Sequence, residues 1–181
     1  LGADDADGAG GLDVLNGTVL TSFTEATANF ETVNYTVGNN IQSTVTGANG
    51  KGVDGATTFN LAGGDSLTTF AIDYVSPASL TKIDYSGYTG KSTASTFAAS
   101  QLVNTMDVVG SAGTDTITTT TANDNAAVKS MSGVETLKIN VAGGATAFNF
   151  AVTSGVTKVQ LDDDGTARIA TLTDLYAGVT V

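Results

Sequence analysis

Two stretches carry the pattern that decides the fold, Val134-Glu135-Thr136-Leu137-Lys138-Ile139 and Val156-Thr157-Lys158-Val159-Gln160-Leu161. Both read apolar, Thr/Glu/Asn, any, apolar, any, apolar. The last two apolar side chains are two residues apart, so they share one face of a β-strand and point into one core. The pattern occurs again in the six-residue segments that begin at Phe30, Leu67, Leu80 and Val103. Turn-forming Gly, Asn, Asp or Ser flanks each copy, which predicts a series of short strands.

A longer repeat overlies the short one. Gly8-Ala9-Gly10-Gly11-Leu12-Asp13-Val14-Leu15 matches Gly110-Ser111-Ala112-Gly113-Thr114-Asp115-Thr116-Ile117 in the form G-x-x-G-x-D-x-apolar. Phe30-Glu31-Thr32-Val33 matches Val134-Glu135-Thr136-Leu137 at a similar shift. The sequence therefore predicts two repeat units, a degenerate one over residues 1–109 and a second over residues 110–181, which can together form one continuous domain.

The composition favours an all-β protein. Thr and Val favour strands, Gly favours turns, and hydrophobic residues make up 41% of the chain, enough for a core. We expect a β-solenoid, in which each rung buries its inward side chains against the neighbouring rungs; a β-sandwich of similar strands is the alternative. One short helix is expected near residues 94–103, with Ser92 or Ser95 as its cap.

The missing residue types argue against several functions. The chain of 181 residues has no Cys and no His, so it has no thiol nucleophile and no imidazole base. Its three glutamates, Glu25, Glu31 and Glu135, are expected at solvent-facing strand edges or register-setting positions, and we expect no enzymatic activity. The net charge of −11 argues against nucleic-acid binding. No apolar run of about 18 residues is present, so no membrane insertion is expected.

Asp13 and Asp115 are candidate calcium ligands. Their G-x-x-G-x-D segments resemble the calcium-binding nonapeptide of repeat-in-toxin proteins, in which Gly allows tight turns and Asp reaches the ion. Here Ala9 and Ser111 replace the second Gly. The alternative is a Gly-rich turn in which Asp13 or Asp115 accepts hydrogen bonds from its own backbone.

Asp162, Asp163 and Asp164 form a second candidate calcium site. Three adjacent carboxylates repel one another unless a cation or full solvation compensates. The alternative is a solvated turn that ends at Gly165. Four tyrosines are expected to be partly buried strand residues, with a sugar-binding surface as the alternative: Tyr74, Tyr85, Tyr88 and Tyr176.

The C-terminal part resembles calcium-dependent surface-layer proteins and large repeat-in-toxin-like adhesins of Gram-negative bacteria, which leave the cell by type I secretion. The residues that carry this resemblance are Gly113–Ile117, Met131–Leu137, Val156–Val159 and Leu172–Val179. The resemblance implies an extracellular, cell-surface location, self-association into a lattice or fibre, and Ca²⁺ in acidic loops. We therefore expect a structural surface-layer component, with an adhesin segment that binds glycans or a host surface as the alternative. A cell-surface polysaccharide is a further expected partner.

Overall fold

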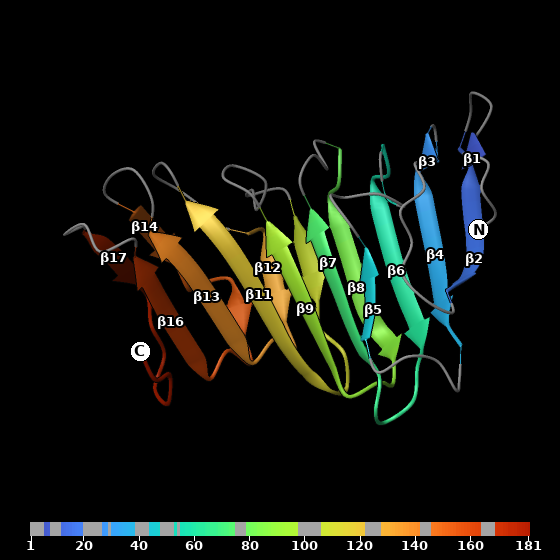
Figure 1. Ribbon diagram of the computed structural model, residues 1–181. Coiled ribbons are helices and arrows are strands. Elements are labelled where there is room, and N and C mark those ends of the chain that lie inside the picture. Colours follow the sequence, from blue (N-terminus) through green and yellow to red (C-terminus); the bar gives the residue numbers. More distant parts are fainter. Residues whose placement is uncertain are drawn as a thin grey trace.

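The chain is an all-β solenoid of parallel strands (Figure 1). The computed structural model describes residues 6–7, 12–19, 27–28, 30–38, 44–47, 53, 55–74, 79–97, 106–121, 128–141, 146–163 and 169–181. Within these residues there are seventeen strands and no helix, so no membrane-spanning helix occurs in this part of the chain. The solenoid prediction is confirmed, and the sandwich alternative is wrong because every strand pair is parallel.

One face of the solenoid is a seven-stranded sheet with the spatial order β15-β12-β10-β8-β6-β4-β2. Its strands, in chain order, are β2 (Val14–Val19), β4 (Thr32–Val37), β6 (Thr58–Gly63), β8 (Lys82–Tyr88), β10 (Asp107–Val109), β12 (Ser130–Ser132) and β15 (Thr153–Ser154).

The opposite face is a six-stranded sheet with the order β16-β13-β11-β9-β7-β5. Its strands are β5 (Thr44–Gly47), β7 (Thr69–Tyr74), β9 (Ser92–Phe97), β11 (Thr114–Thr121), β13 (Thr136–Val141) and β16 (Lys158–Asp163). Two short pairs complete the rungs at the ends: β1 (Ala6–Asp7) with β3 (Thr27–Ala28), and β14 (Thr146–Asn149) with β17 (Ala170–Thr173).

The core lies between the two sheets, and the six-residue pattern fills it. Its last two apolar side chains are buried in five of the six copies: Val33 and Tyr35, Phe70 and Ile72, Ile83 and Tyr85, Met106 and Val108, and Leu137 and Ile139. In the sixth copy Val159 is buried but Leu161 is 44% exposed, because β16 is the last strand of its sheet. Strand pairing holds these side chains in columns, so each rung supplies the packing surface for the next.

The first apolar position of the pattern is more variable. Leu80, Val134 and Val156 are at most 2% exposed, whereas Leu67 is 75% exposed. Leu67 lies in a turn in which its own N–H donates to Asp65 Oδ1 at 2.9 Å. This local hydrogen bond directs the Leu67 side chain away from the core.

The helix expected near residues 94–103 is wrong where the structure describes it. Residues 94–97 belong to β9, which pairs with β7 on one side and β11 on the other. Phe97 alternates inward and stacks on Tyr74 with ring centroids 4.7 Å apart. Pairing on both edges satisfies the backbone of this segment, and that tertiary context overrides the weak local preference for a helix. Residues 98–105 lie outside the described residues.

Both sheets run without interruption across residues 109 and 110, the boundary between the two predicted repeat units. β10 pairs with β8 and β12, while β11 pairs with β9 and β13. The two G-x-x-G-x-D segments nevertheless lead into opposite faces: Asp13 precedes β2 of the seven-stranded sheet, and Asp115 lies in β11 of the six-stranded sheet.

Leu80 and Leu67 provide a matched test of the core, because they occupy the same position of the pattern. Leu80→Ala should lower the free energy of unfolding by about 2–5 kcal/mol, since it leaves a cavity in the core. Leu67→Ala should change it by less than about 0.5 kcal/mol. Chemical denaturation of both variants measures the difference. Equal effects would contradict the described burial.

Candidate functional site

Asp115 lies at the centre of a buried hydrogen-bond network at a corner of the solenoid. Its side chain is 0% exposed and points inward from β11. The Thr93 hydroxyl of the preceding rung donates to Oδ1. Ser111 donates twice to Oδ2, from its N–H at 2.7 Å and from its hydroxyl at 2.9 Å. Both carboxylate oxygens therefore serve as acceptors that fix the corner, as a buried charge requires.

The two glycines of this motif are needed because the rungs approach closely. A Cβ atom at Gly110 would lie 1.9 Å from the backbone oxygen of Gly133. A Cβ at Gly113 would lie 2.7 Å from the backbone oxygens of Gly90 and Lys91. Close rung contact thus accounts for both glycines of G-x-x-G-x-D. Ser111, which departs from the calcium nonapeptide, supplies the donors to Asp115.

Glu135 joins this corner to the next rung. Its Oε2 atom accepts the Asp115 N–H at 2.7 Å, and its backbone oxygen accepts the N–H groups of Thr157 and Lys158 at 2.9 and 3.0 Å. Glu31 does the same at the corner that precedes β2, which we call the first corner: its Oε2 accepts the Asp13 N–H at 2.6 Å. Glu31 and Glu135 thus each bond the backbone of a neighbouring rung, which agrees with a register-setting position, one of the two alternatives expected for the glutamates; Glu25 lies outside the described residues.

The pairing of Asp with Glu left a signal in the sequence. Asp13 and Glu31 are 18 residues apart, and Asp115 and Glu135 are 20 residues apart. In both cases this separation equals the number of residues between paired positions on neighbouring rungs. Recognising that spacing would have required the rung length, which the six-residue pattern alone did not give.

Glu135→Ala should destabilise the protein by about 1–3 kcal/mol, because it leaves the Asp115 N–H without its acceptor. Glu135→Gln keeps an acceptor oxygen and should restore most of that loss. Chemical denaturation of the two variants measures the difference, with Glu31→Ala and Glu31→Gln as the matched pair at the first corner. The role of Glu135 as an acceptor would be rejected if its Gln and Ala variants were equally unstable.

A second buried network consists of hydroxyl groups. Tyr85 Oη lies 2.8 Å from Tyr74 Oη and 2.7 Å from Ser95 Oγ, and Tyr88 Oη donates to the Thr68 backbone oxygen at 2.7 Å. The three tyrosines are at most 1% exposed, so the interpretation as buried strand tyrosines is confirmed for them. Tyr176 is 37% exposed and donates to the Val156 backbone oxygen at 2.8 Å.

Burial governs the acidity of these hydroxyls. Burial raises the pKa of Tyr74 well above its usual value, and the neighbouring Tyr85 adds to the effect. Burial also raises the pKa of Tyr85, against the lowering effect of its hydrogen bonds with Ser95 and Tyr74. The pKa of Tyr88 rises to about 12 through burial and the negative charges of Asp65 and Asp115. The folded state thus keeps these protons more tightly than the unfolded state does.

The raised tyrosine pKa values predict alkaline unfolding. Their contribution to stability is fully present below about pH 10, the unfolded tyrosine pKa, and is lost as pH rises through the folded values, about 12 for Tyr88. The free energy of unfolding, measured by denaturation at each pH, should fall over this range, and tyrosinate absorbance should appear together with unfolding. Tyr88→Phe should be less stable at neutral pH but lose less stability across that window. Titration of all tyrosines near pH 10 without loss of structure would contradict the described burial.

Among the described residues, three ion pairs lie on the outer faces. They join Lys82 with Asp84, Lys129 with Asp107 and Lys138 with Asp162, at 3.0, 2.7 and 2.9 Å. Hydrogen bonds from Lys129 and then Ser130 lower the pKa of Asp107. Because these side chains are partly exposed, each pair stabilises the fold by at most about 1 kcal/mol. Asp162, a candidate calcium ligand, thus forms an ion pair with Lys138 of the neighbouring strand.

The candidate calcium ligands that the structure describes, Asp13, Asp115 and Asp162, lie on different strands or corners and do not form one cluster. Asp13 lies beside the first strand of the seven-stranded sheet, and Asp115 is inside the molecule on the other sheet. Asp162 and Asp163 end β16, the side chain of Asp163 and all of Asp164 lying outside what is described. Among the described residues, no three acidic side chains lie close enough to hold a metal ion. Calcium binding therefore stays a prediction.

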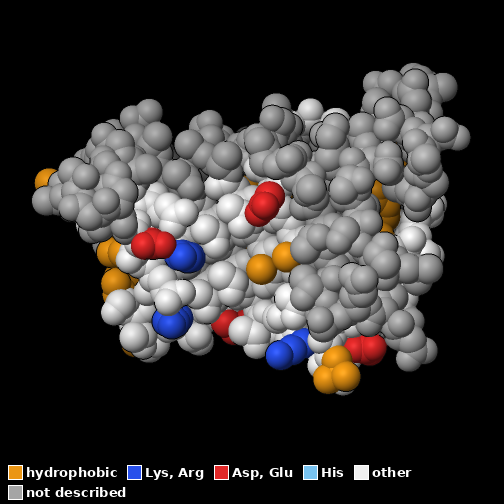
Figure 2. All heavy atoms as spheres, in the orientation of Figure 1, with side chains coloured by type: hydrophobic (Ala, Val, Ile, Leu, Met, Phe, Trp, Pro, Cys, Tyr) orange, Lys and Arg blue, Asp and Glu red, His pale blue; other side chains and the backbone are white. Residues whose placement is uncertain are grey.

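Where the face that includes the six-stranded sheet is not drawn in grey, most of it is neither hydrophobic nor charged, and the few charged side chains include an acidic and a basic group side by side (Figure 2). The large exposed apolar side chains of the described residues are concentrated at the two ends of the solenoid. Two are at the N-terminal end and six at the C-terminal end, with Leu67 between them: Leu12, Val14, Val152, Leu161, Ile169, Leu175, Tyr176 and Val181. Within the described part of the chain, the end rungs thus expose most of the large apolar side chains.

No protein-family model, curated protein or solved structure matches this chain.

Proposed function

We propose that this chain is a non-catalytic structural segment of a bacterial surface layer, located outside the cell and built to self-associate. The observation that supports this proposal is a continuous parallel ladder of rungs, seven strands on one face and six on the other, around a core filled with side chains. Such a solenoid extends along one axis by adding rungs, which suits a building block.

The buried carboxylate and hydroxyl groups form hydrogen bonds within the scaffold. Asp115 accepts the donors of its own corner, Glu135 accepts the Asp115 N–H, and Tyr85 bonds Tyr74 and Ser95 inside the core. Catalytic acids and bases need access to a substrate, and Asp115 and Tyr85 are at most 1% exposed. This use of polar groups supports a structural role.

Calcium in the acidic loops is part of the same proposal. At Asp115 an ion would have to replace the donors from Thr93 and Ser111, so we assign the proposed ions to the loops of Asp13 and of Asp162, Asp163 and Asp164. Carboxylate oxygens are the ligands that calcium prefers. Neutralising part of the net charge of −11 would reduce repulsion between neighbouring copies.

The alternative is an adhesin segment that binds a glycan, such as a cell-surface polysaccharide. The feature that favours it is the row of hydroxyls on the outer face of the six-stranded sheet, where Thr69, Ser92 and Thr114 are in register on neighbouring strands. Hydroxyl groups can both donate to and accept from sugar hydroxyls.

Calcium titration of EDTA-treated protein tests the proposal. Calcium at 100 times its Kd should stabilise the fold by about 2.7 kcal/mol and raise Tm, because the ion binds only the folded or assembled state. Light scattering should then show growth of large particles, and electron microscopy should show ordered sheets or fibres. The triple variant Asp162→Asn, Asp163→Asn, Asp164→Asn should lose much of the response, whereas the exposed Asp73→Asn should keep it.

Each other outcome is informative. An unchanged Tm and unchanged scattering would reject the calcium assignment. Protein that remains monomeric with and without calcium yet binds glycans on an array would replace the surface-layer proposal with the adhesin.

A further inference from the structure

The outer face of the six-stranded sheet carries a regular array of hydroxyl groups. On β7, β9 and β11 the outward positions of neighbouring strands are in register, and they form three rows. The first row is Thr69, Ser92 and Thr114, the second is Ala71, Ala94 and Thr116, and the third is Asp73, Thr96 and Thr118. Thr136 of β13 continues the second row beside Thr116. We call the seven hydroxyl residues of this array the hydroxyl plane: Thr69, Ser92, Thr96, Thr114, Thr116, Thr118 and Thr136.

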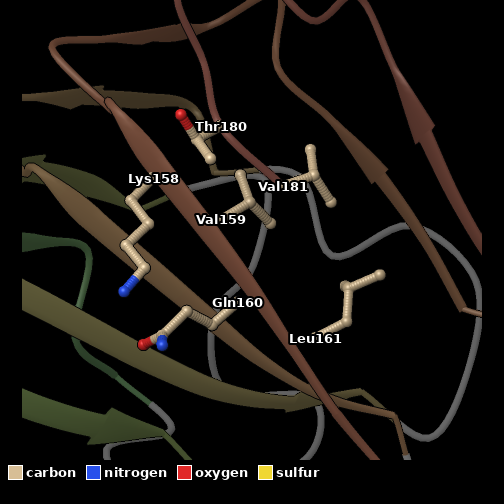
Figure 3. Close-up of a pocket in the computed structure, with 6 residues that line it drawn as sticks. All are labelled: Lys158, Val159, Gln160, Leu161, Thr180 and Val181. Atoms are coloured by element: carbon tan, nitrogen blue, oxygen red, sulfur yellow. The ribbon is translucent and has the colours of Figure 1, made fainter.

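Only short side chains project from the hydroxyl plane. Among the nine outward residues of β7, β9 and β11, Asp73 has the longest side chain. Apart from Asp73 and Thr114, which are exposed, these side chains are partly buried although they point outward, because their neighbours on the sheet cover their flanks. Longer side chains border the plane on β16, where Lys158 continues the second row and Gln160 the third. Both extend to the side of the strand opposite Val159 (Figure 3).

The hydroxyl plane repeats at fixed distances. Neighbouring strands lie about 4.8 Å apart, and successive outward residues of one strand lie about 6.7 Å apart. Threonine side chains are stiff because they branch at Cβ, so little rotamer freedom is lost when they contact a surface. The Thr69 and Ser92 hydroxyls are also fixed by a hydrogen bond with each other, at 3.1 Å between their oxygens. The plane thus presents groups that both donate and accept hydrogen bonds at a regular spacing.

The charge of the hydroxyl plane restricts what can cover it. The chain has a net charge of −11, yet Asp73 is the single charged residue among the nine outward positions of β7, β9 and β11. A second copy of this acidic chain would be repelled, whereas an uncharged partner is matched to a face without charge. These nine positions also hold no aromatic ring on which a sugar could stack, because the aromatic side chains of the same rungs are buried in the core: Phe70, Tyr74, Tyr85, Tyr88 and Phe97. The array therefore favours an uncharged partner that is itself a rigid lattice of hydrogen-bonding groups.

We propose that the hydroxyl plane binds the surface of ice. This activity goes beyond the proposed structural role and does not depend on it. On an ice face each water molecule holds a fixed lattice position and both donates and accepts hydrogen bonds, as a hydroxyl group does. Both repeat distances of the plane are close to distances between water molecules on ice faces, so several hydroxyls can take lattice positions at once. The threonine methyl groups between them leave liquid water on contact, which adds a favourable hydrophobic contribution.

Partitioning into slowly growing ice tests the proposal. When a dilute solution is partly frozen onto a cold surface, the unaltered protein should enter the ice, whereas a protein that does not bind ice stays in the liquid. Thr116 lies at the centre of the plane, between Ala94 and Thr136. Thr116→Lys should lower the fraction of protein in the ice by about tenfold or more, because the contact would have to desolvate the ammonium group. Nanolitre osmometry should show the same loss in the gap between the melting and freezing temperatures.

Thr32→Lys is the matched control, since Thr32 is a partly buried, outward threonine of the opposite sheet. It should enter the ice like the unaltered protein, and circular dichroism with thermal melting checks that both variants are folded. Exclusion of the unaltered protein from the ice, or equal incorporation of the two variants, overturns the proposal. Exclusion from ice together with retention on crystalline cellulose replaces it with a polysaccharide contact. The calcium and light-scattering results decide the surface-layer proposal separately, so each proposal can fail without the other.

Discussion

The close approach of parallel rungs is the constraint on which the rest of the structure depends. Neighbouring strands lie about 4.8 Å apart, so every corner must let two backbones pass without a side chain between them. Gly110 meets this demand against Gly133, and Gly113 meets it against Gly90 and Lys91. Once the corner backbones are in contact, their N–H groups need acceptors, which the rung geometry alone does not supply.

Carboxylates provide those acceptors, and this use explains why the molecule buries a charged group. The Asp115 carboxylate accepts hydrogen bonds from Thr93 and Ser111. The Glu135 carboxylate accepts the Asp115 N–H, and the Glu135 backbone oxygen accepts the Thr157 N–H of the following rung. Each corner is therefore tied to the rungs before and after it. These corner bonds add to the register that the buried apolar face of each sheet already specifies.

The sequence predicted the elements better than the corners. The six-residue pattern located the strands and their inward side chains because strand periodicity is local, and five of its copies are buried as expected. It failed at Leu67, where a hydrogen bond to Asp65 turns the side chain outward, and at residues 94–97, where pairing with two neighbouring strands overrides local preference. The local partner of Asp115, the Ser111 N–H, agrees with the alternative of a turn that bonds its own backbone. The partners Thr93 and Glu135 could not be predicted, because they come from rungs about 20 residues away whose spacing only the fold defines.

The two corners built around Asp13 and Asp115 lie on opposite faces of one solenoid. The long repeat therefore spans a half-integral number of rungs, and its two copies are related by a half-turn combined with a translation, which is a screw operation. The same Asp–Glu hydrogen bond is thus formed at corners of both faces, because Glu31 accepts the Asp13 N–H and Glu135 accepts the Asp115 N–H. One short sequence element therefore serves either sheet of the solenoid.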